Sequence, residues 1–438
     1  MRDVQSWLQE RLPGLIAEHA VPGIAVGVWV GGEVVDAAAG VLNTATGVEA
    51  TTDSIFQIGS VTKVLTATLA MQLVDERKVE LDAPVRRYLP GFARDVTVRQ
   101  LMCHVAGFEG DIFTDTGPGD DCIERYVDLL ADVPQLFAPG SMFSYNNAAF
   151  CVLGRLIEVV RGKQFDACMR DHLFEPLGMT HAANNPYEAI LHRAAVGHLH
   201  GQPVKTWAMA RSNAPAGSML AMRARDLVRF ARLQGQVLSA DSAAAMQEPQ
   251  ITLPDIGWAD AWGLGWEMSE LPGGTVIGHD GSTVGQAAFL RVVPERDVAI
   301  AILTNGGTPR PVHAELMGRL LQELAGVTFP ELPVPDPGAR PAHPERYVGR
   351  YTSRESITDV RLDTDGRLWL EQTPIGVSAE VGDQPHRTEL VAWRGDSLLP
   401  VEPSGGVHWP VAFVGRDSDG RAQYLHTGRA DLRSSSIG

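Results

Sequence analysis

A proline-rich stretch near residue 330 limits the possible folds most, because it divides the chain in two. Six prolines lie between Phe329 and Pro344. Proline fixes φ and lacks an amide donor, so such a run favours a stiff extended linker over a helix or strand. We therefore expect a large domain over residues 1–330, a linker over 331–344 and a small domain over 345–438.

Short alternating segments with Asp-Gly turns follow the linker. One example is Asp359–Leu362, which the Asp365-Gly366 turn joins to Leu368–Leu370. This pattern is typical of paired β-strands, and its repetition predicts a small all-β module, such as a barrel. The module has no titratable cluster that suggests chemistry. We expect it to have an interaction or lid role.

The large domain begins with a mixed pattern of helix and strand. Asp3–His19 is predicted to be helical, and Ile24–Val30 is a predicted strand that Gly31-Gly32 turns into a second strand. Near the end of the domain, two apolar runs flank Pro294–Asp297 and predict another antiparallel pair. The sequence therefore favours an antiparallel sheet with helices around it.

Charge and composition exclude several classes of partner. The formal net charge of -16 would repel nucleic acid and anionic membranes, so we expect neither as a partner. The N-terminus lacks the basic and apolar regions of an export signal, and no apolar run approaches bilayer-spanning length, so we expect a cytoplasmic protein. The four cysteines show no metal-ligand spacing. We expect no metal and no cofactor.

The first stretch with chemical potential is Ser60-x-x-Lys63, at the start of a helical pattern that runs to Asp75. Residues three apart on a helix share a face, so the serine hydroxyl and the lysine amine would be neighbours. This arrangement suits a nucleophile beside its base. The alternative is that Ser60 only caps the helix and Lys63 is solvated.

Two further stretches carry polar residues at suggestive spacings. Tyr145 and Asn147 lie two apart in a loop and project to similar sides if the backbone is extended. His279-Asp280-Gly281 precedes an apolar strand, and Gly281 would allow close approach of a ligand or backbone. The alternatives are an aromatic core residue with an Asx turn, and a simple hairpin turn. We expect His104 to be a buried histidine bonded to backbone.

Together, Ser60-x-x-Lys63, Tyr145-x-Asn147 and His279-x-Gly281 resemble the motifs of the serine β-lactamase and penicillin-binding-protein superfamily. They look most like its class C-like branch of esterases, D-amino-acid peptidases and transacylases. The resemblance covers roughly residues 10–325. The small domain is similar to lipocalin-like β modules found on some members. We expect an α/β (α+β) fold: an antiparallel sheet flanked by helices, an all-helical lobe between roughly residues 75 and 215, and the site at their junction.

The resemblance implies catalytic roles for three residues. Ser60 would be the acylated nucleophile, and Lys63 would be its base, since a desolvated lysine has a depressed pKa. Tyr145 would relay the proton to the leaving group and later activate the deacylating water. No metal is needed for these steps.

The resemblance also implies a substrate-binding set. Asn147 would position Lys63 and the acyl side chain, and the backbone amides of Ser60 and Ser282 would form an oxyanion hole. The set is completed by His279, Asp280 and Gly281. The expected partner is a small-molecule or short-peptide acyl substrate.

The chain departs from the β-lactamase pattern at the third motif. β-Lactamases resemble each other in having Lys-Thr-Gly or Lys-Ser-Gly where this chain has His279-Asp280-Gly281. Asp280 would repel a substrate carboxylate if its side chain faces the cleft, so we expect poor β-lactam turnover and a neutral or cationic ester or amide substrate. An unperturbed histidine has a pKa of about 6.5. If neutral His279 is required, activity should fall in mild acid.

The resemblance implies a hydrolase that cleaves an ester or amide through acylation of Ser60. One alternative is an acyltransferase that passes the acyl group to an amine or alcohol. A second is a binding or sensor protein without turnover. An α/β-hydrolase fits poorly, because no G-x-S-x-G lies between a predicted strand and a helix.

Overall fold

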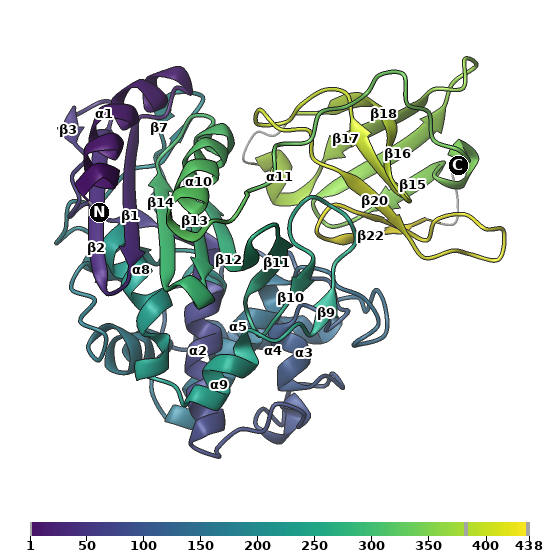
Figure 1. Ribbon diagram of the computed structural model, residues 1–438. Helices are drawn as coiled ribbons and strands as arrows, with labels where there is room; N and C mark the ends of the chain where they lie inside the picture. The colour runs from purple at the N-terminus through teal and green to yellow at the C-terminus, as the bar shows by residue number, and fades with distance from the viewer. Residues whose placement is uncertain (1, 381–383, 435–438) are drawn as a thin grey trace.

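The computed structural model describes residues 2–380 and 384–434. Figure 1 shows a larger mixed α/β part beside a smaller barrel. Among the described residues, a nine-stranded sheet crosses the larger part in the order β3-β2-β1-β14-β13-β12-β11-β10-β9. Its strands are β1 (Gly23–Val30), β2 (Glu33–Asn43), β3 (Val48–Glu49), β9 (Ile251–Thr252), β10 (Ala261–Trp262), β11 (Glu267–Leu271), β12 (Gly274–Thr283), β13 (Gln286–Val293) and β14 (Val298–Thr304).

Local sequence explains the two hairpins that were expected in this sheet. Gly31 and Gly32 connect β1 to β2 with φ of 54° and 90°, which glycine adopts without strain. The pair β13 and β14 is antiparallel, with Val293 opposite Val298 across the turn. Both predictions are confirmed. Inside this open sheet β1 pairs with β14, so the first and last strands of the large domain are neighbours.

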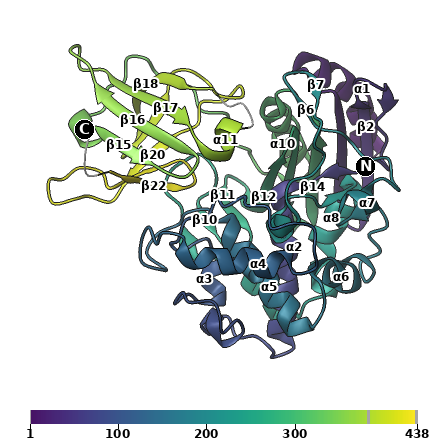
Figure 2. The same ribbon diagram turned by 180° about the vertical axis from the view of Figure 1, so that it is seen from behind.

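Helices cover both faces of the sheet (Figures 1 and 2). On one face, α1 (Arg2–Glu18) and α10 (Pro309–Ala325) bury apolar side chains such as Leu12 and Leu320. Each buried leucine contributes about 2 kcal/mol relative to an exposed one. On the other face, α8 (Ala224–Leu233) separates the sheet from the helical lobe.

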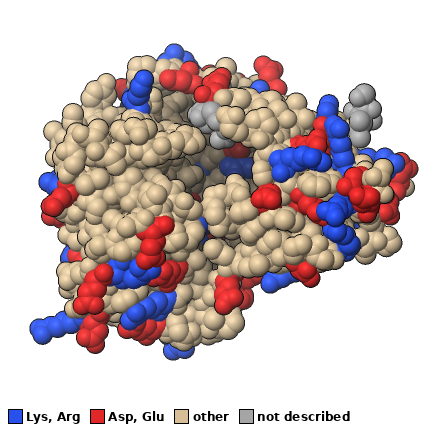
Figure 3. Space-filling model, turned by 90° about the horizontal axis from the view of Figure 1, so that it is seen from above, with Lys and Arg blue, Asp and Glu red and all other residues tan. Residues whose placement is uncertain are grey.

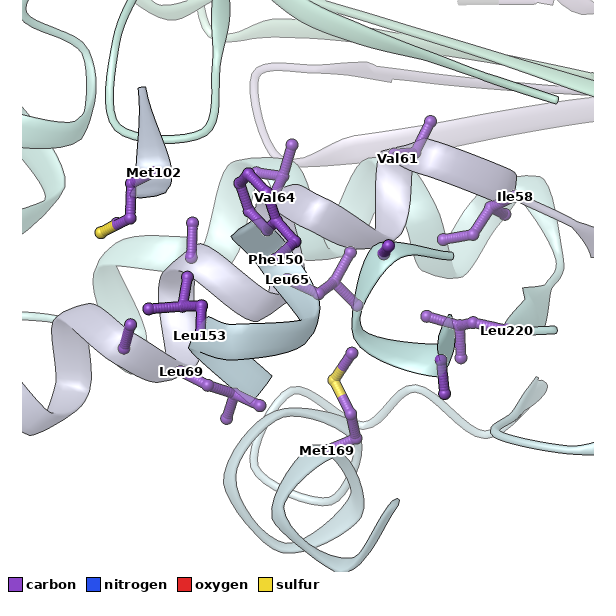
Figure 4. Close-up of a cluster of buried hydrophobic side chains, with 14 of the residues drawn as sticks. Ile58, Val61, Val64, Leu65, Leu69, Met102, Phe150, Leu153, Met169 and Leu220 are labelled. Atoms are coloured by element: carbon purple, nitrogen blue, oxygen red, sulfur yellow. The ribbon is translucent and has the colours of Figure 1, made fainter. Parts of the chain in front are cut away.

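The helical lobe is built around one central helix. Nearly every residue of α2 (Thr62–Asp75) is buried, and Figure 4 shows Leu65 and Leu69 among side chains of other elements, including Phe150 and Leu153. The other helices of this part are α3 (Val98–Met102), α4 (Cys122–Leu129), α5 (Asn147–Arg161), α6 (Phe165–Met169), α7 (Pro186–Ala189) and α9 (Ala240–Met246). The short strands β4 (Phe56–Gln57), β5 (Ala182–Ala183), β6 (His198–Leu199), β7 (Gln202–Pro203) and β8 (Ala221–Met222) interrupt them. Packing on all sides holds α2 rigidly. The residues at its start, such as Lys63, are therefore held in fixed positions.

The C-terminal segments form a closed barrel, so the prediction of an all-β module is confirmed. Closure leaves the barrel without exposed strand edges. Its strands are β15 (Gly349–Thr352), β16 (Ser356–Leu362), β17 (Leu368–Pro374), β18 (His386–Arg394), β19 (Ser397–Pro400), β20 (Val411–Val414), β21 (Tyr424–His426) and β22 (Ala430–Arg433), with α11 (Gly376–Glu380) after β17.

The domain boundaries stay a prediction. The large part ends with α10 at Ala325 and the barrel begins with β15 at Gly349. A short 3-10 turn, Pro344–Arg346, lies between them. Within the predicted small domain, residues 381–383 and 435–438 are outside the described residues.

The hairpin of β21 and β22 docks on the loop that leads into α5. The amide of Tyr145 donates to the carbonyl of Gly428 at 2.9 Å. The His426 Nε2 is 2.8 Å from the Phe143 carbonyl, and the Ala430 amide donates to Ser144 Oγ at 3.1 Å. Seen from above, the surface is hollowed between the two parts, with basic side chains in the hollow (Figure 3). The barrel therefore touches the segment that carries a predicted catalytic residue.

The described residues contain no helix that combines the length and hydropathy needed to cross a bilayer.

Candidate active site

Ser60 lies in a 3-10 turn, Gly59–Val61, that runs directly into α2. The turn bends at Gly59, whose φ is 51°. Neither the turn nor α2 has a side-chain cap hydrogen bond. The structure therefore gives no support to the alternative that Ser60 serves only as a helix cap.

Lys63 is fully buried one turn further along, so the alternative of a solvated side chain is wrong. Its Nζ donates to Ser60 Oγ at 2.9 Å and to the Ala216 carbonyl at 2.6 Å. Burial, together with the positive charge of Arg429, lowers the pKa of Lys63 to about 7 against opposing effects of Cys151 and Asp111. A buried amine with this pKa is neutral in a large fraction of molecules near neutral pH, so it can accept the serine proton.

Tyr145 lies against the same pair, 6% exposed. The Lys63 Nζ is 4.9 Å from the centroid of the tyrosine ring. Burial raises the pKa of the Tyr145 hydroxyl, and a contribution from Ser60 offsets this only in part. Within the described chain the hydroxyl has no partner at hydrogen-bonding geometry. Tyr145 therefore stays protonated at neutral pH and has a proton to relay.

His104 supports the tyrosine from behind. It is fully buried, and its Nδ1 accepts the Asn146 amide at 2.9 Å, which confirms the expected backbone bond. Its ring stacks on Tyr145 with centroids 4.2 Å apart. Its φ of 57° is uncommon for a residue with a side chain. The surrounding packing keeps His104 in this conformation, directly behind the tyrosine ring.

The third motif approaches the nucleophile through its backbone. A Cβ added at Gly281 would lie 2.0 Å from the Ile58 carbonyl and 2.9 Å from the Ser60 amide nitrogen. A Cβ at Gly59 would lie 2.5 Å from the Ser282 amide nitrogen. Only glycines allow β12 and the Ser60 turn to pack this closely, as expected for Gly281. The amides of Ser60 and Ser282 consequently lie beside each other.

His279 faces the tyrosine, with ring centroids 6.1 Å apart. Burial lowers the pKa of His279 to about 3, and Lys63 lowers it as well. The imidazole therefore stays neutral in mild acid, and this pKa gives no support to the expectation that activity falls there through His279. Its Nδ1 lies 2.6 Å from the Asp280 carbonyl, which leaves Nε2 as an acceptor.

The side chain of Asp280 points to the opposite face of β12 from the side chain of His279. Successive residues of a strand point to opposite faces, and the Asp280 carboxylate pairs with Arg291 at 2.7 Å and with Arg310 of α10. Burial raises the pKa of Asp280, but the two arginines outweigh it and hold the pKa well below its usual value. The expected repulsion of a substrate carboxylate by Asp280 therefore loses its basis. The same geometry argues against a direct role of Asp280 in substrate binding.

Asn147 contacts a residue that sequence reasoning missed. Its Nδ2 donates to Asp111 Oδ1 at 2.7 Å, and no hydrogen bond to Lys63 is found in the described part of the chain. Arg429 of the barrel binds the same carboxylate, with Nε 2.6 Å from Oδ2 and Nη2 3.3 Å from Oδ1. Its guanidinium carbon is 4.8 Å from the Tyr145 ring centroid. Asp111 and Arg429 are 318 residues apart, and no local sequence pattern links them.

Metal ligands do not cluster: among the residues that the structure describes, no group of three or more His, Cys, Asp or Glu side chains could hold a metal ion.

The fold and this arrangement define a serine acyl-transfer hydrolase of the β-lactamase type. A family profile described as Beta-lactamase matches residues 8–324, and the chain belongs to that family.

Individual relatives span most of the chain. It is 43% identical over 368 residues to "Penicillin-binding protein 4" of Amycolatopsis lactamdurans, covering 78% of this chain and 96% of that protein. The solved structure "Crystal structure of SurE with D-Leu" matches with a TM-score of 0.80 and 29% identity, over 99% of this chain and 100% of that one. The D-amino acid amidase of Ochrobactrum anthropi SV3 with D-phenylalanine shares the fold, with a TM-score of 0.61 and 24% identity over 70% of this chain and 92% of that one.

Proposed function

We propose that this protein cleaves an ester or amide bond of a small molecule or short peptide through a covalent acyl group on Ser60. The observation that carries the proposal is the buried Lys63 amine, 2.9 Å from Ser60 Oγ, with a pKa of about 7. A lysine exposed to water would be protonated at neutral pH and could not act as a base.

The proposed reaction uses three side chains, Ser60, Lys63 and Tyr145. Lys63 takes the Ser60 proton as Oγ attacks the carbonyl carbon, and the amides of Ser60 and Ser282 stabilise the oxyanion. The proton passes through Tyr145 to the leaving alcohol or amine, which departs as the acyl-enzyme ester forms. Water or an amine then attacks the ester, gives its proton back by the same route, and Ser60 is regenerated.

The acyl group we propose contains a residue of D configuration. This part of the proposal rests on one structural neighbour, the solved SurE structure, which contains D-Leu. A negative group on the substrate is compatible with the site, because Asp280 is paired and Arg429 adds a positive charge near Tyr145.

Transfer of the acyl group to an amine is the second candidate. Hydrolysis and transfer have the same first half, and the competing acceptor decides between them.

Intact-protein mass spectrometry tests the proposal. The protein is exposed briefly to p-nitrophenyl esters and to D- and L-aminoacyl amides, with and without an added amine. We expect a transient acyl adduct with the D series, absent in Ser60→Ala. The ratio of amide to free acid then measures transfer against hydrolysis. No adduct on the wild type, or an adduct that persists in Ser60→Ala, would overturn the proposal.

A lysine pair supplies the matched control. Lys63→Met should lower the acylation rate by about a thousandfold, within the range for loss of a general base. Lys205→Met removes an exposed lysine of the same domain and should leave the rate unchanged. Equal rates in the two variants would show that Lys63 is not the base.

A further inference from the structure

The barrel contributes a charged residue to the site, and that residue contacts both Asp111 and the ring of Tyr145. The Arg429 side chain is 35% exposed, in the turn between β21 and β22. It holds the Asp111 carboxylate through two nitrogens and also lies over the Tyr145 ring. Neither contact is available to the hydrolase part alone.

The turn is fixed against the site by backbone as well. Gly428 accepts the Tyr145 amide at 2.9 Å. A Cβ on Gly428 would lie 2.1 Å from the Trp258 ring, and its φ is 102°. A turn packed this tightly places the next side chain reproducibly, so the position of Arg429 over Tyr145 is set by the fold of the hairpin.

We propose that Arg429 is a positioning residue for acyl transfer, which acts through Asp111 on Asn147 and through space on the Ser60–Lys63–Tyr145 group. The fork of the guanidinium fixes the Asp111 carboxylate, and Asp111 Oδ1 in turn fixes the amide of Asn147. This orientation leaves the Asn147 carbonyl oxygen for the substrate or for Lys63. The inference rests on the serine mechanism proposed above.

The charges of Asp111 and Arg429 change the pKa of Lys63 in definite directions. Asp111 raises the pKa of Lys63 and Arg429 lowers it, so the two charges oppose each other at the base. Loss of Arg429 would leave the carboxylate unopposed and raise the pKa of Lys63. Loss of Asp111 would leave the guanidinium unopposed and lower the pKa.

The other groups that face Lys63 carry no charge near neutral pH. Burial raises the pKa of Cys151 on α5 to about 12. Burial lowers the pKa of His104 well below its usual value and that of His279 on β12 to about 3. Burial also raises the pKa of Tyr145. Burial is the main cause of the low pKa of Lys63, and Asp111 and Arg429 are the charged pair that adjusts this pKa in opposite directions.

A double-mutant cycle tests the proposal in the full-length protein. The acylation rate is measured against pH with a neutral p-nitrophenyl ester, so that substrate charge plays no part. We expect Arg429→Gln to move the pH midpoint upward and Asp111→Asn to move it downward. The double variant should return close to the wild-type midpoint. Arg429→Lys keeps the charge without the fork, so its midpoint should stay near wild type while the rate falls.

Arg416→Gln is the matched control, because Arg416 is an exposed barrel arginine 3.7 Å from its partner Asp396. It should leave both rate and midpoint unchanged. Thermal unfolding confirms that each variant is folded before its profile is compared. Unchanged midpoints, or shifts of the same sign in both single variants, would overturn the inference. Activity that survives Ser60→Ala would instead overturn the proposed function on which it rests.

Discussion

At the scale of single residues, we expect the titration of Lys63 to determine how the acylation rate depends on pH. The base must be neutral to accept the Ser60 proton, and its pKa is about 7. We expect acylation to rise by about tenfold per pH unit below pH 7 and to level off above it. Stopped-flow acylation with a neutral ester measures this profile.

The same profile separates Lys63 from His279. Because His279 has a pKa of about 3, His279→Gln should leave the midpoint near pH 7 in place even if the rate changes. If the midpoint moved with His279→Gln, the titrating group would be the imidazole rather than the amine.

No single spacing identified Ser60, Lys63 and Tyr145; the resemblance of three motifs to a known superfamily pointed to them, and the structure brings them together. The sequence alone could not predict the orientation of the Asp280 side chain. That orientation depends on Arg310, which comes from a helix behind the sheet. The Asp111–Arg429 pair, whose partners lie in different domains, was also missed. Pairs of this kind depend on how distant elements pack, and no local pattern shows that.

At the scale of elements, the close packing of β12 on the Ser60 turn can be tested at one glycine. A Cβ at Gly281 would lie 2.0 Å from the Ile58 carbonyl, so Gly281→Ala must push the strand away from Ser60. Displacing an oxyanion donor costs about a hundredfold to a thousandfold in rate. We expect a loss of this size, measured as the acylation rate.

Gly318→Ala in α10 provides the control, because nothing lies within 4 Å of the added Cβ. It should leave the rate unchanged and stabilise the helix by up to about 1 kcal/mol. If Gly281→Ala acylated as fast as Gly318→Ala, the backbone contact would have no catalytic role.

Elements were predictable where one local rule was strong enough. The Gly31-Gly32 turn specified the β1–β2 hairpin, and the apolar run after Ser60 specified α2. The order of the strands in the sheet was not predictable, because β1 pairs with β14 across most of the domain. The docking of the β21–β22 hairpin depends on hydrogen bonds to the loop before α5. The alternation of apolar and polar residues along the strands cannot predict these contacts.

At the scale of the whole molecule, the barrel and the hydrolase part should behave as one unit even when the chain between them is cut. We expect a site-specific protease, with its recognition sequence inserted near Val334, to leave the two pieces bound and active. Val334 is 80% exposed, so the cut is accessible. Gel filtration and ester hydrolysis after cleavage measure association and rate. Separation of the pieces with full activity in the larger one would contradict this expectation.

The position of Arg429 in the chain also has a consequence for synthesis. Ser60, Lys63, Asp111 and Tyr145 leave the ribosome long before the β21–β22 hairpin that packs on them. Domains generally fold in order of synthesis, so the hydrolase part can collapse around its nucleophile while the barrel is still being made. Until the hairpin docks, the nascent chain holds Ser60 without Arg429 beside Asp111. If Arg429 acts as proposed, we expect full activity only after the barrel has folded.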